Sequence, residues 1–585
     1  MNFQKGGKMK SINKISLVSL SLILVLVISG HQNLGAISPH PDFETEIKSG
    51  KKSLPNWIFN PRYLEQRGVN QPSLHPISQV YPTGTGPVGP FKALVLLVNF
   101  SDNSSTVNAS FFDTLVFENQ QGCVRHYYKE VSYDALDIIT VDLPSTTGWH
   151  TAPQTYSYYV NAQYGLGSYP QNAQKLVEDL VDLVDLACGI DFSEYDNDSD
   201  GYVDALIVVH AGPGAEFTSS PSDIWSHKWA VSWSWSLTLK DGVRIWDYTM
   251  QPEYWQNPYD MTCGVYCHEL GHVFGLPDLY DTDYSSAGIA RWSLMASGSW
   301  NGSLGNSPAH PDAWCMTRLG YVTPTTVMAN ATGVEIPAIK DSPSIFKLWT
   351  NGSPANEYFL VENRQKIGYD SYLPYHGLLI YHIDENVGDY GANDNEWYPG
   401  YTDYGHYKVA AEQADGLWQM EKNINLGNSG DPYPGTYDRR TFNSSSTPNS
   451  QSYAGSETYV GVTNISDSGD TMTCDFSVNP LDVEDQGDDD LLPHFYVLKQ
   501  NCPNPFNPET KIEYNLADNG WIKLEVFNIL GQKIVTLIDG YKRKGRHFAI
   551  WNGTDEEGRA LSSGIYLYQI TTETFQKANK MILLK

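Results

Sequence analysis

The stretch YCHELGHVFGLPDLYD, Tyr266 to Asp281, decides how the chain is interpreted. It contains the pattern HExxHxxGxxD, in which His268 and His272 are four residues apart and Glu269 follows the first histidine. Residues four apart lie on one face of an α-helix, so both imidazoles can reach one metal ion. Glu269 lies about 100° further round the helix, where it can contact a metal-bound water without binding the metal.

The residues around this helix complete the predicted site. Asp260 is placed to cap a helix that begins near Met261, and Gly275 is placed to end it in the left-handed conformation. The chain then reverses, and Asp278 returns as a third ligand. Three protein ligands leave one position for water, which is typical of catalytic zinc. The pattern therefore predicts zinc bound by the two histidines and the aspartate, with the glutamate as general base.

Two alternatives compete with this interpretation. A bare HExxH arises by chance, and histidines on a buried helix face are often core residues, but the longer pattern is far less prone to chance. Cys263 and Cys267 form a second metal-type pair at the same spacing. That pair is rotated by about 100° or more from the histidines, so one ion cannot use both pairs.

The composition is that of an acidic, globular, multidomain chain. Its 585 residues exceed one compact core and predict about three to five units. There are 67 acidic against 38 basic residues, giving a net charge of −29. Such a surface argues against nucleic acid and anionic lipid as partners. The seven cysteines are few and odd in number, so the chain is not a disulfide scaffold.

The N-terminus has the pattern of a secretory signal peptide. Four lysines precede the apolar run ISLVSLSLILVLVIS, Ile15 to Ser29, and cleavage is predicted near Ala36. A retained membrane anchor is the alternative, but the run is shorter than the ~20 residues of a spanning helix. No other stretch is long and apolar enough to span a membrane. Residues 37–90 are polar and proline-rich, which indicates a pro-segment or linker.

The remaining chain is expected to form three folded regions. Residues 91–325 mix buried-strand signals, the first at Phe91, with an amphipathic helix at Asn172 to Ala187, which indicates an α+β domain. Residues 326–478 show short apolar runs between turns and are predicted to be β-rich. An acidic linker follows at 479–493. Residues 494–585 are predicted to form a small β-sandwich of the immunoglobulin type.

The stretch DNDSDGYVD has the spacing of a calcium-binding loop. Hard oxygens at two-residue steps are what calcium prefers. The twelfth position of an EF-hand is Ile207 here, and a strand follows in place of a helix, so a remote ligand such as Glu194 or Glu216 is needed. A solvated acidic turn is the alternative. The predicted ligands are Asp196, Asp198, Asp200, the Tyr202 carbonyl and Asp204.

Longer stretches resemble a known family. HELGHVFGLPD, followed by RWSLMASGSWNG and HPDAWCMTRLGYV, is similar to the immune inhibitor A-type secreted metallopeptidases, which are metzincin-like enzymes. The resemblance implies that His268, His272 and Asp278 bind zinc and that Glu269 is the catalytic base. It also implies that Met295 is the methionine of the turn beneath the metal, where the alternative is a core methionine. The presumed pro-segment holds no cysteine, so a thiolate switch cannot impose latency.

The last region resembles the C-terminal sorting domains of the type IX secretion system. The matching stretches include LKQNCPNPFNPETKIEYNL, AIWNGTDEEGRALSSGIYLYQI and the ending KMILLK. Cys502 departs from the aromatic residue that such domains usually carry. The resemblance implies export from a Gram-negative bacterium by the type IX machinery, followed by release or surface attachment. A generic β-sandwich binding module is the alternative.

These observations favour a secreted zinc endopeptidase that acts on extracellular proteins and peptides, with calcium as a structural ion. A surface adhesin or glycan-binding protein with an inactive metal site is the second hypothesis, and zinc hydrolysis of a non-peptide substrate is the third. An oxyanion stabiliser is expected. Tyr280 and His227 are weighed for that role, against a packing role for each.

Overall fold

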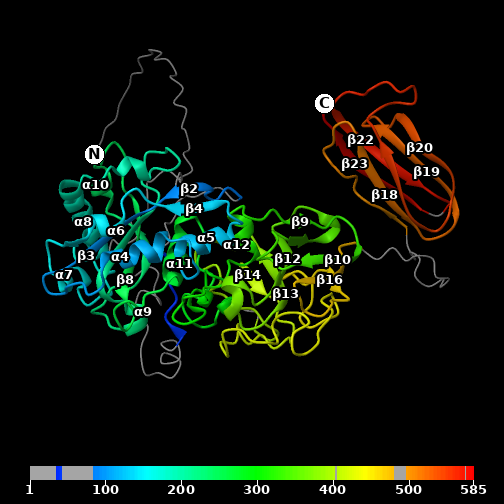
Figure 1. The fold of residues 1–585 in the computed structure, drawn as a ribbon. Helices are drawn as coiled ribbons and strands as arrows, with labels where there is room; N and C mark the ends of the chain where they lie inside the picture. The colour runs from blue at the N-terminus through cyan, green and yellow to red at the C-terminus, as the bar shows by residue number, and fades with distance from the viewer. Residues whose placement is uncertain (1–34, 42–83, 402–404, 480–495, 574) are drawn as a thin grey trace, which may run out of the picture. The chain divides into compact units, whose positions relative to one another are not determined.

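The computed structural model describes residues 35–41, 84–401, 405–479, 496–573 and 575–585 (Figure 1). The chain divides into two compact units, Met1–Pro480 and Leu481–Lys585. The predicted signal peptide and acidic linker lie almost wholly outside the described residues. None of the helices described is both long and apolar enough to cross a bilayer. All seven cysteines lie in the described part of the chain, and each is a free thiol.

A six-stranded sheet forms the centre of the first unit, in the order β1–β7–β8–β6–β3–β5. Neighbouring strands from β8 to β5 run parallel, whereas β7 is antiparallel to β8 and β1 is antiparallel to β7. The predicted buried strands are confirmed as β3 and β6, whose nearly continuous apolar runs suit strands covered on both faces. The bounds are β1 Gly35–Ala36, β3 Leu94–Asn99, β5 Trp149–Thr151, β6 Leu206–Pro213, β7 His227–Ala230 and β8 Asp247–Tyr254.

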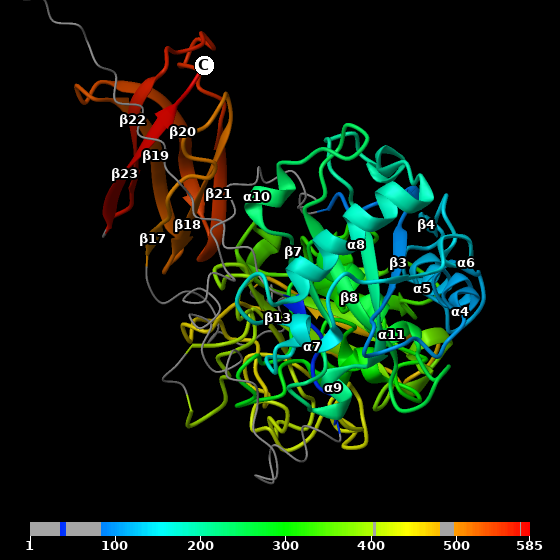
Figure 2. The ribbon, with the colours of Figure 1, turned by 90° about the vertical axis from the view of Figure 1, so that its left-hand side faces the viewer.

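Helices cover both faces of this sheet (Figure 2). Side chains of β3 that point to one face pack with α8 (Ala173–Cys188), and those on the other pack in the cluster that contains α5 (Val124–Val131) and α11 (Cys263–Val273). The predicted amphipathic helix is confirmed as α8. Asn172 caps it by accepting a hydrogen bond from the backbone N–H of Lys175.

Short elements complete the region around the sheet. Strands β2 and β4 form a small parallel pair, and the remaining helices are one or two turns long. Their bounds are β2 Gly89–Lys92, α4 Ala109–Phe112, β4 Leu136–Ile139, α6 Pro144–Thr147, α7 Tyr156–Val160, α9 Ala215–Thr218, α10 Trp233–Ser236 and α12 Ala313–Arg318.

The β-rich region contains two sheets, in the orders β14–β13–β12–β11–β9 and β10–β16–β15. Strands β12 and β13 are buried along almost their whole length, because one face joins the core around α11 and the other packs against the smaller sheet. The expected boundary near residue 325 is therefore not a boundary between compact units. The bounds are β9 Thr325–Thr326, β10 Ala331–Pro337, β11 Ile345–Leu348, β12 Glu357–Arg364, β13 Gly377–Asp384, β14 Val409–Ala411, β15 Gly461–Thr463 and β16 Thr471–Ser477.

Arg364 connects the β-rich region to the peptidase region. Its guanidinium is fully buried, and Nη2 lies 2.7 Å from Oδ1 of Asp370. Nη1 lies 3.2 Å from Oε1 of Glu362 and donates to the carbonyl of Trp292 at 3.1 Å. The Asp370 carboxylate also accepts from the backbone N–H of His310 at 2.9 Å. One buried cation thus fixes segments that lie on both sides of residue 325.

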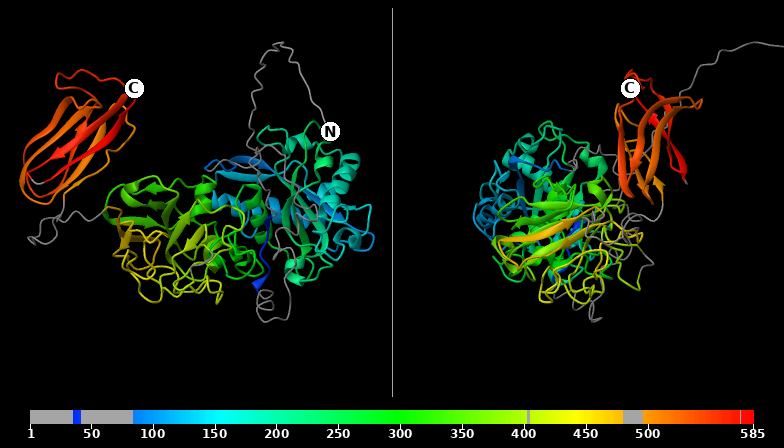
Figure 3. Two further views of the ribbon diagram at one scale, coloured as in Figure 1. Left: turned by 180° about the vertical axis from the view of Figure 1, so that it is seen from behind. Right: turned by 90° about the vertical axis from the view of Figure 1, so that its right-hand side faces the viewer.

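The second unit is β-rich, as predicted. Two sheets, β17–β18–β21 and β20–β19–β22–β23, enclose one apolar cluster (Figure 3). Alternating buried and exposed residues in β18 and β22 are typical of strands with one face on a core. The bounds are β17 Val497–Leu498, β18 Thr510–Leu516, β19 Gly520–Asn528, β20 Lys533–Lys542, β21 Gly545–Trp551, β22 Gly564–Thr571 and β23 Gln576–Leu583.

Candidate active site

Helix α11 carries both histidines of the HExxH pattern. The residue before it, Thr262, makes no side-chain cap, and the predicted cap Asp260 is wrong. The Asp260 carboxylate instead accepts hydrogen bonds from three backbone N–H groups of the preceding turn. Gly275 has a φ of +89°, which confirms the left-handed turn after the helix. The donors to Asp260 are the backbone N–H groups of Trp255, Gln256 and Asn257.

The two imidazoles direct their unprotonated Nε2 atoms toward each other. His268 Nδ1 lies 2.9 Å from the carbonyl of Leu294, and His272 Nδ1 lies 2.8 Å from that of Leu276. A carbonyl oxygen can only accept, so each Nδ1 carries the ring hydrogen and each Nε2 carries a lone pair. The two Nε2 atoms are 3.1 Å apart. Neither can donate to the other, and a shared cation is the natural partner for both.

Asp278 adds an oxygen to the same point. Its Oδ1 lies 3.2 Å from both Nε2 atoms, yet this buried oxygen has no hydrogen-bond partner. A buried carboxylate oxygen without a partner is costly unless a cation is present. The three donor atoms lie within 4.8 Å of one another. Two imidazole nitrogens and one carboxylate oxygen fit zinc and leave a coordination position open.

Glu269 lies on the same helix, beside this donor set. Its side chain is fully buried. Burial raises the pKa of Glu269 well above its usual value, and the negative charges of Asp278 and Glu216 raise it further. Its Oε1 accepts a hydrogen bond of 3.0 Å from the backbone N–H of Ile37. A carboxylate in such surroundings has a high proton affinity, which suits a general base.

Met295 lies directly beneath the histidine helix. A Cβ added to Gly271 would come within 2.6 Å of the Met295 sulfur. The carbonyl of Met295 accepts from the N–H of Leu279, the residue after the third donor, at 2.8 Å. The neighbouring carbonyl of Leu294 holds His268. This short segment therefore positions both ends of the donor set through its backbone.

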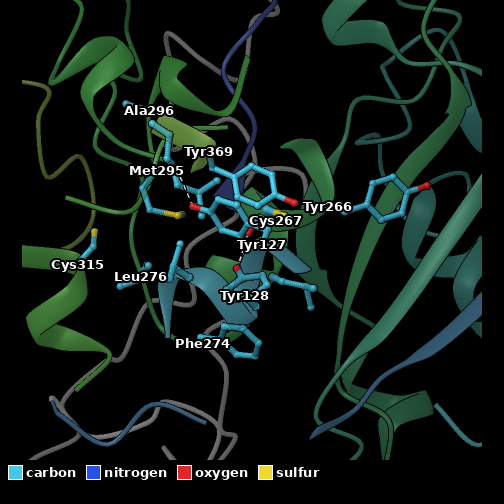
Figure 4. Packing of buried hydrophobic residues seen from close by; sticks show 14 of the residues in the cluster. Tyr127, Tyr128, Tyr266, Cys267, Phe274, Leu276, Met295, Ala296, Cys315 and Tyr369 are labelled. Atoms are coloured by element: carbon cyan, nitrogen blue, oxygen red, sulfur yellow. Dashed lines mark hydrogen bonds between the residues drawn. The ribbon is translucent and has the colours of Figure 1, made fainter. Parts of the chain in front are cut away.

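Buried aromatic residues pack around helix α11 (Figure 4). The Tyr128 hydroxyl donates to the carbonyl of Cys267 at 2.6 Å, and the Tyr127 hydroxyl donates to the carbonyl of Ala309 at 2.7 Å. Cys263 and Cys267 are buried in this core. Neither belongs to a metal-type donor group in the part of the chain that the structure describes. In the structure the two cysteines of α11 pack in the core, and the two histidines face the donor set.

The segment that follows the predicted signal cleavage site lies in the active site. Strand β1 pairs antiparallel with β7, and Ile37 beside it is 1% exposed. The first buried-strand signal is predicted at Phe91, and residues 37–90 are predicted to be a pro-segment or linker, whereas the structure places residues 35–41 against the sheet. The segment folds because it completes the open edge of the sheet, which no local pattern reveals.

Three further residues of the cleft were missed from the sequence. The indole N–H groups of Trp225 and Trp300 donate to the carbonyls of Ile37 and Ser38, at 3.1 and 2.9 Å. The carbonyl of Glu216 accepts a hydrogen bond from the backbone N–H of His40 at 3.1 Å. The Glu216 carboxylate accepts one from the backbone N–H of Ser226, and not from the acidic loop. These residues come from separate loops, and no motif marks them. Glu216 therefore does not serve as the remote calcium ligand that was considered for it.

Tyr280, one of the two residues weighed as oxyanion stabilisers, is buried and follows Asp278 by two residues. Burial raises the pKa of Tyr280 well above its usual value, and the charges of Asp278 and Glu269 raise it further. The imidazole of His227 points into the sheet instead, where its Nε2 lies 3.1 Å from the hydroxyl of Tyr248. Burial lowers the pKa of His227 to about 4, so it packs as a neutral ring.

Two further buried histidines, His310 and His382, lie beside carboxylates. His310 Nε2 lies 2.8 Å from Glu130 Oε1, and His382 Nε2 lies 3.0 Å from Glu357 Oε1. Neither histidine belongs to a metal-type donor group among the described residues. Both stabilise the shared core.

The acidic loop brings together three of its five predicted calcium donors. Asp196, Asp198 and Asp204 offer carboxylate oxygens within 4.8 Å of one another, whereas the Asp200 carboxylate is not in this group. The Asp196 carboxylate accepts from the backbone N–H of Asp200 at 3.1 Å. Burial raises the pKa of Asp204 to about 7, and the charges of Asp198 and Asp200 contribute.

Two known protein families match parts of this chain. Residues 83–320 match the immune inhibitor A peptidase M6 catalytic domain. Residues 502–584 match the secretion system C-terminal sorting domain. The resemblances to both families that the sequence shows are therefore confirmed.

Two curated relatives match part of this chain. Immune inhibitor A of Bacillus thuringiensis subsp. alesti is 29% identical over 281 residues, which is 38% of this chain and 38% of the relative. Pre-pro-metalloprotease PrtV of Vibrio cholerae serotype O1 is 27% identical over 332 residues, 46% of this chain and 34% of the relative. The matches thus span little more than a third of either relative. Among solved structures, latent PorU of Porphyromonas gingivalis is 18% identical over 21% of this chain and 12% of PorU, with a TM-score of 0.14, too low to inform the fold.

Proposed function

Since residues 83–320 belong to the immune inhibitor A peptidase M6 catalytic domain family and residues 502–584 to the sorting-domain family, we propose that this chain is a secreted zinc endopeptidase. Its substrates are proposed to be extracellular proteins and peptides. One observation carries the proposal: two lone-pair imidazole nitrogens and the partnerless Oδ1 of Asp278 converge beside the buried carboxylate of Glu269. Metzincin-like architecture is part of the proposal, supported by Met295 beneath the helix and by strand β7, which runs antiparallel to β8.

The proposed mechanism assigns one role to each group. His268, His272 and Asp278 would hold zinc, which supplies an acidified water and a polarised carbonyl when bound. Glu269 takes a proton from the attacking water and delivers it to the leaving amine. Its burial keeps its proton affinity high enough for both transfers. The Tyr280 hydroxyl is proposed to donate to the oxyanion that develops on the substrate carbonyl.

Export is proposed to use the C-terminal unit. The sorting-domain match implies the type IX secretion machinery as a partner, and hence a Gram-negative cell with release of the protein or attachment to the cell surface. Residues 1–36 are proposed to be the signal peptide, with cleavage near Ala36. The described residues contain no helix suited to span a membrane, and the net charge of −29 disfavours nucleic acid as a partner.

Calcium at the acidic loop is a separate proposal. Asp196, Asp198 and Asp204 support it, because three close carboxylates repel one another and a divalent cation would relieve this. Binding to the folded state alone would raise stability. Calcium should raise the melting temperature of the wild type more than that of Asp198→Asn, with exposed Asp134→Asn as the matched control. Equal responses in all three proteins would exclude calcium binding at the loop.

The first experiment compares casein hydrolysis by the full chain and by Glu269→Gln, with zinc content measured in both. Glu269→Gln keeps the shape of the side chain but cannot carry the proton. Activity in the wild type alone, with equal zinc in both proteins, would support the peptidase and the base. Full zinc occupancy without any cleavage by the wild type would reject the enzyme and leave an inactive binding protein as the remaining hypothesis.

A further inference from the structure

A small cavity in the β-rich region lies beside strand β14. Its volume is about 180 Å³, and the described residues that line it include no member of the donor set. Four aromatic side chains contribute to its wall, namely Trp397, Tyr407, Trp418 and Tyr453. Pockets for drug-sized ligands measure about 300–1,000 Å³, so this cavity has room for a single side chain and not for an oligosaccharide.

The wall of this cavity also carries two carboxyl groups, Glu412 and Glu421. Glu421 is buried, and its Oε2 accepts a hydrogen bond from the side-chain amide of Gln413. Burial raises the pKa of Glu421 to about 8, and the negative charges of Glu412 and Asp431 contribute. A cation beside such a carboxyl would favour its ionised form and would be attracted by it.

The basic group of the wall, His382, is already paired with carboxylates. Its Nε2 lies 3.0 Å from Glu357 Oε1, and its Nδ1 lies 3.3 Å from Glu412 Oε1. Burial lowers the pKa of His382, but the two carboxylates more than offset this, so the pKa lies above its ordinary value. The described residues that line the cavity include no lysine or arginine. A cationic ligand would therefore complement this wall.

The aromatic side of the cavity is held rigid by stacked rings. The ring of Tyr453 lies between those of His382 and His406, with centroids 4.1 and 3.6 Å away and planes within 14° of parallel. His406 Nε2 lies 2.8 Å from Asp384 Oδ2, which fixes the outer ring. Trp397 meets Tyr453 edge-on, at 6.1 Å. A wall fixed in this way loses little conformational freedom when a ligand binds.

A cation of the chain itself already lies against these aromatic residues. The Nζ of Lys422 is 5.7 Å from the ring centroid of Trp418 and 5.2 Å from that of Tyr398. It donates to the carbonyl of Leu417 at 2.8 Å, and Lys422 is not among the residues that line the cavity. Aromatic faces attract ammonium and guanidinium groups. The rim thus shows the contact that a ligand would make inside.

We propose that this cavity binds the charged end of a lysine or arginine side chain of a protein substrate, as a contact additional to the reaction centre. The role in substrate capture rests on the proposed peptidase function, whereas binding of the cation does not. The aromatic rings would cover the aliphatic stem, and the carboxyl groups would face the charge. Such a contact is the same before and during the reaction, so it lowers KM and leaves kcat unchanged.

The first test measures binding to the full chain by saturation-transfer NMR. The probes are acetyl-lysine methylamide and acetyl-arginine methylamide, with acetyl-norleucine methylamide as the neutral control. At least one cationic probe should bind about tenfold more tightly than the neutral probe, and comparison of the two identifies the preferred cation. Equal binding of all three probes would overturn the inference. Tighter binding of N-acetylglucosamine than of either cation would also overturn it, in favour of a glycan site.

Variants assign the binding to the cavity. Trp418→Leu keeps an apolar side chain without the aromatic face and should weaken binding of the cationic probe about 3- to 30-fold. Glu412→Gln keeps the shape of the side chain and should change affinity in the same direction, which guards against misfolding of the first variant. Trp521→Leu, at an exposed position of the second unit, is the matched control and should bind as the wild type does. Wild-type affinity in both cavity variants would overturn the inference.

The second test compares hydrolysis of casein with hydrolysis of casein whose lysines are acetylated. The wild type should show a KM about 3- to 10-fold lower for the unmodified protein, and Trp418→Leu should lose most of this difference at unchanged kcat. An equal difference in both enzymes would place the preference at the reaction centre and overturn the role of the cavity. Failure of the wild type to cleave casein, with the cationic probe bound, would reject the proposed function and leave the cation site standing.

Discussion

The sulfur of Met295 lies where a side chain on Gly271 would begin: a Cβ added there would come within 2.6 Å of it. Gly271 lies between the two histidines on α11, so its lack of a side chain lets the methionine support the helix from below. Gly271→Ala should destabilise the protein by about 1–3 kcal/mol, because Gly271 and Met295 are both buried and the added methyl group would be overpacked against the sulfur. Zinc affinity should fall as well. Thermal unfolding and zinc titration measure the two effects.

The sign of this change is diagnostic, since alanine normally stabilises a helix interior by about 0.5–1 kcal/mol over glycine. The double variant Gly271→Ala with Met295→Ala removes the clash and should recover part of the loss in a double-mutant cycle. A more stable Gly271→Ala single variant would show that the sulfur does not lie against the helix.

Replacing Tyr280 by phenylalanine removes one hydroxyl from the reaction centre. If this hydroxyl stabilises the oxyanion, kcat should fall about 100-fold with KM little changed. Zinc content and melting temperature should stay near wild type. Tyr284→Phe, whose ring centroid lies 6.0 Å from that of Tyr280, is the matched control and should keep its activity. Wild-type kcat in Tyr280→Phe would assign the hydroxyl a packing role.

Removing the buried cation of Arg364 should destabilise the whole first unit. Arg364→Ala leaves the carboxylates of Asp370 and Glu362 buried without their partner, at a cost of about 3–5 kcal/mol. Chemical unfolding measures this loss. Arg440→Ala is the control, because that side chain is 38% exposed and its ion pairs are screened by solvent. Similar midpoints for both variants would contradict a structural role for Arg364.

A buried carboxyl in the β-rich region predicts a pH dependence of stability. Burial raises the pKa of Glu421 to about 8, and the charges of Glu412 and Asp431 contribute. The unfolded value is about 4.3, so folding takes up a proton between these limits and stability declines as pH rises through 8. The slope reaches about 1.4 kcal/mol per pH unit.

Glu421→Gln removes this proton uptake. Its melting temperature should fall less than that of the wild type between pH 6 and pH 9, as measured by scanning fluorimetry. Glu457→Gln, at an exposed position, should follow the wild-type curve. Parallel curves for all three proteins would mean that Glu421 is ionised in the folded state.

Local sequence patterns predict the elements that depend on near neighbours. The spacing of His268 and His272 predicts their common helix face, and the apolar runs predict β3 and β6. The cap at Asp260 is mispredicted because the same carboxylate can close a turn or start a helix, and local sequence does not decide between them.

Contacts between distant segments could not be predicted in this way. Ile37 and Glu269 are 232 residues apart, and nothing around Ile37 marks it as a partner of the catalytic base. The sequence also does not reveal that residues on both sides of position 325 share one core. The apolar runs in β12 and β13 predict that these strands are buried, but not which elements cover them. The sequence therefore predicts the donor set of the site, whereas only the structure shows that Ile37 lies beside Glu269.

The pairing of β1 with β7 also affects how the protein behaves in solution. A free sheet edge is a template for association with other chains, including copies of the same protein. While Gly35 and Ala36 cover β7, the sheet presents no such template on that side. Removal of residues 35 and 36 would expose the hydrogen-bonding edge of β7 and would favour association of the protein with other extended chains.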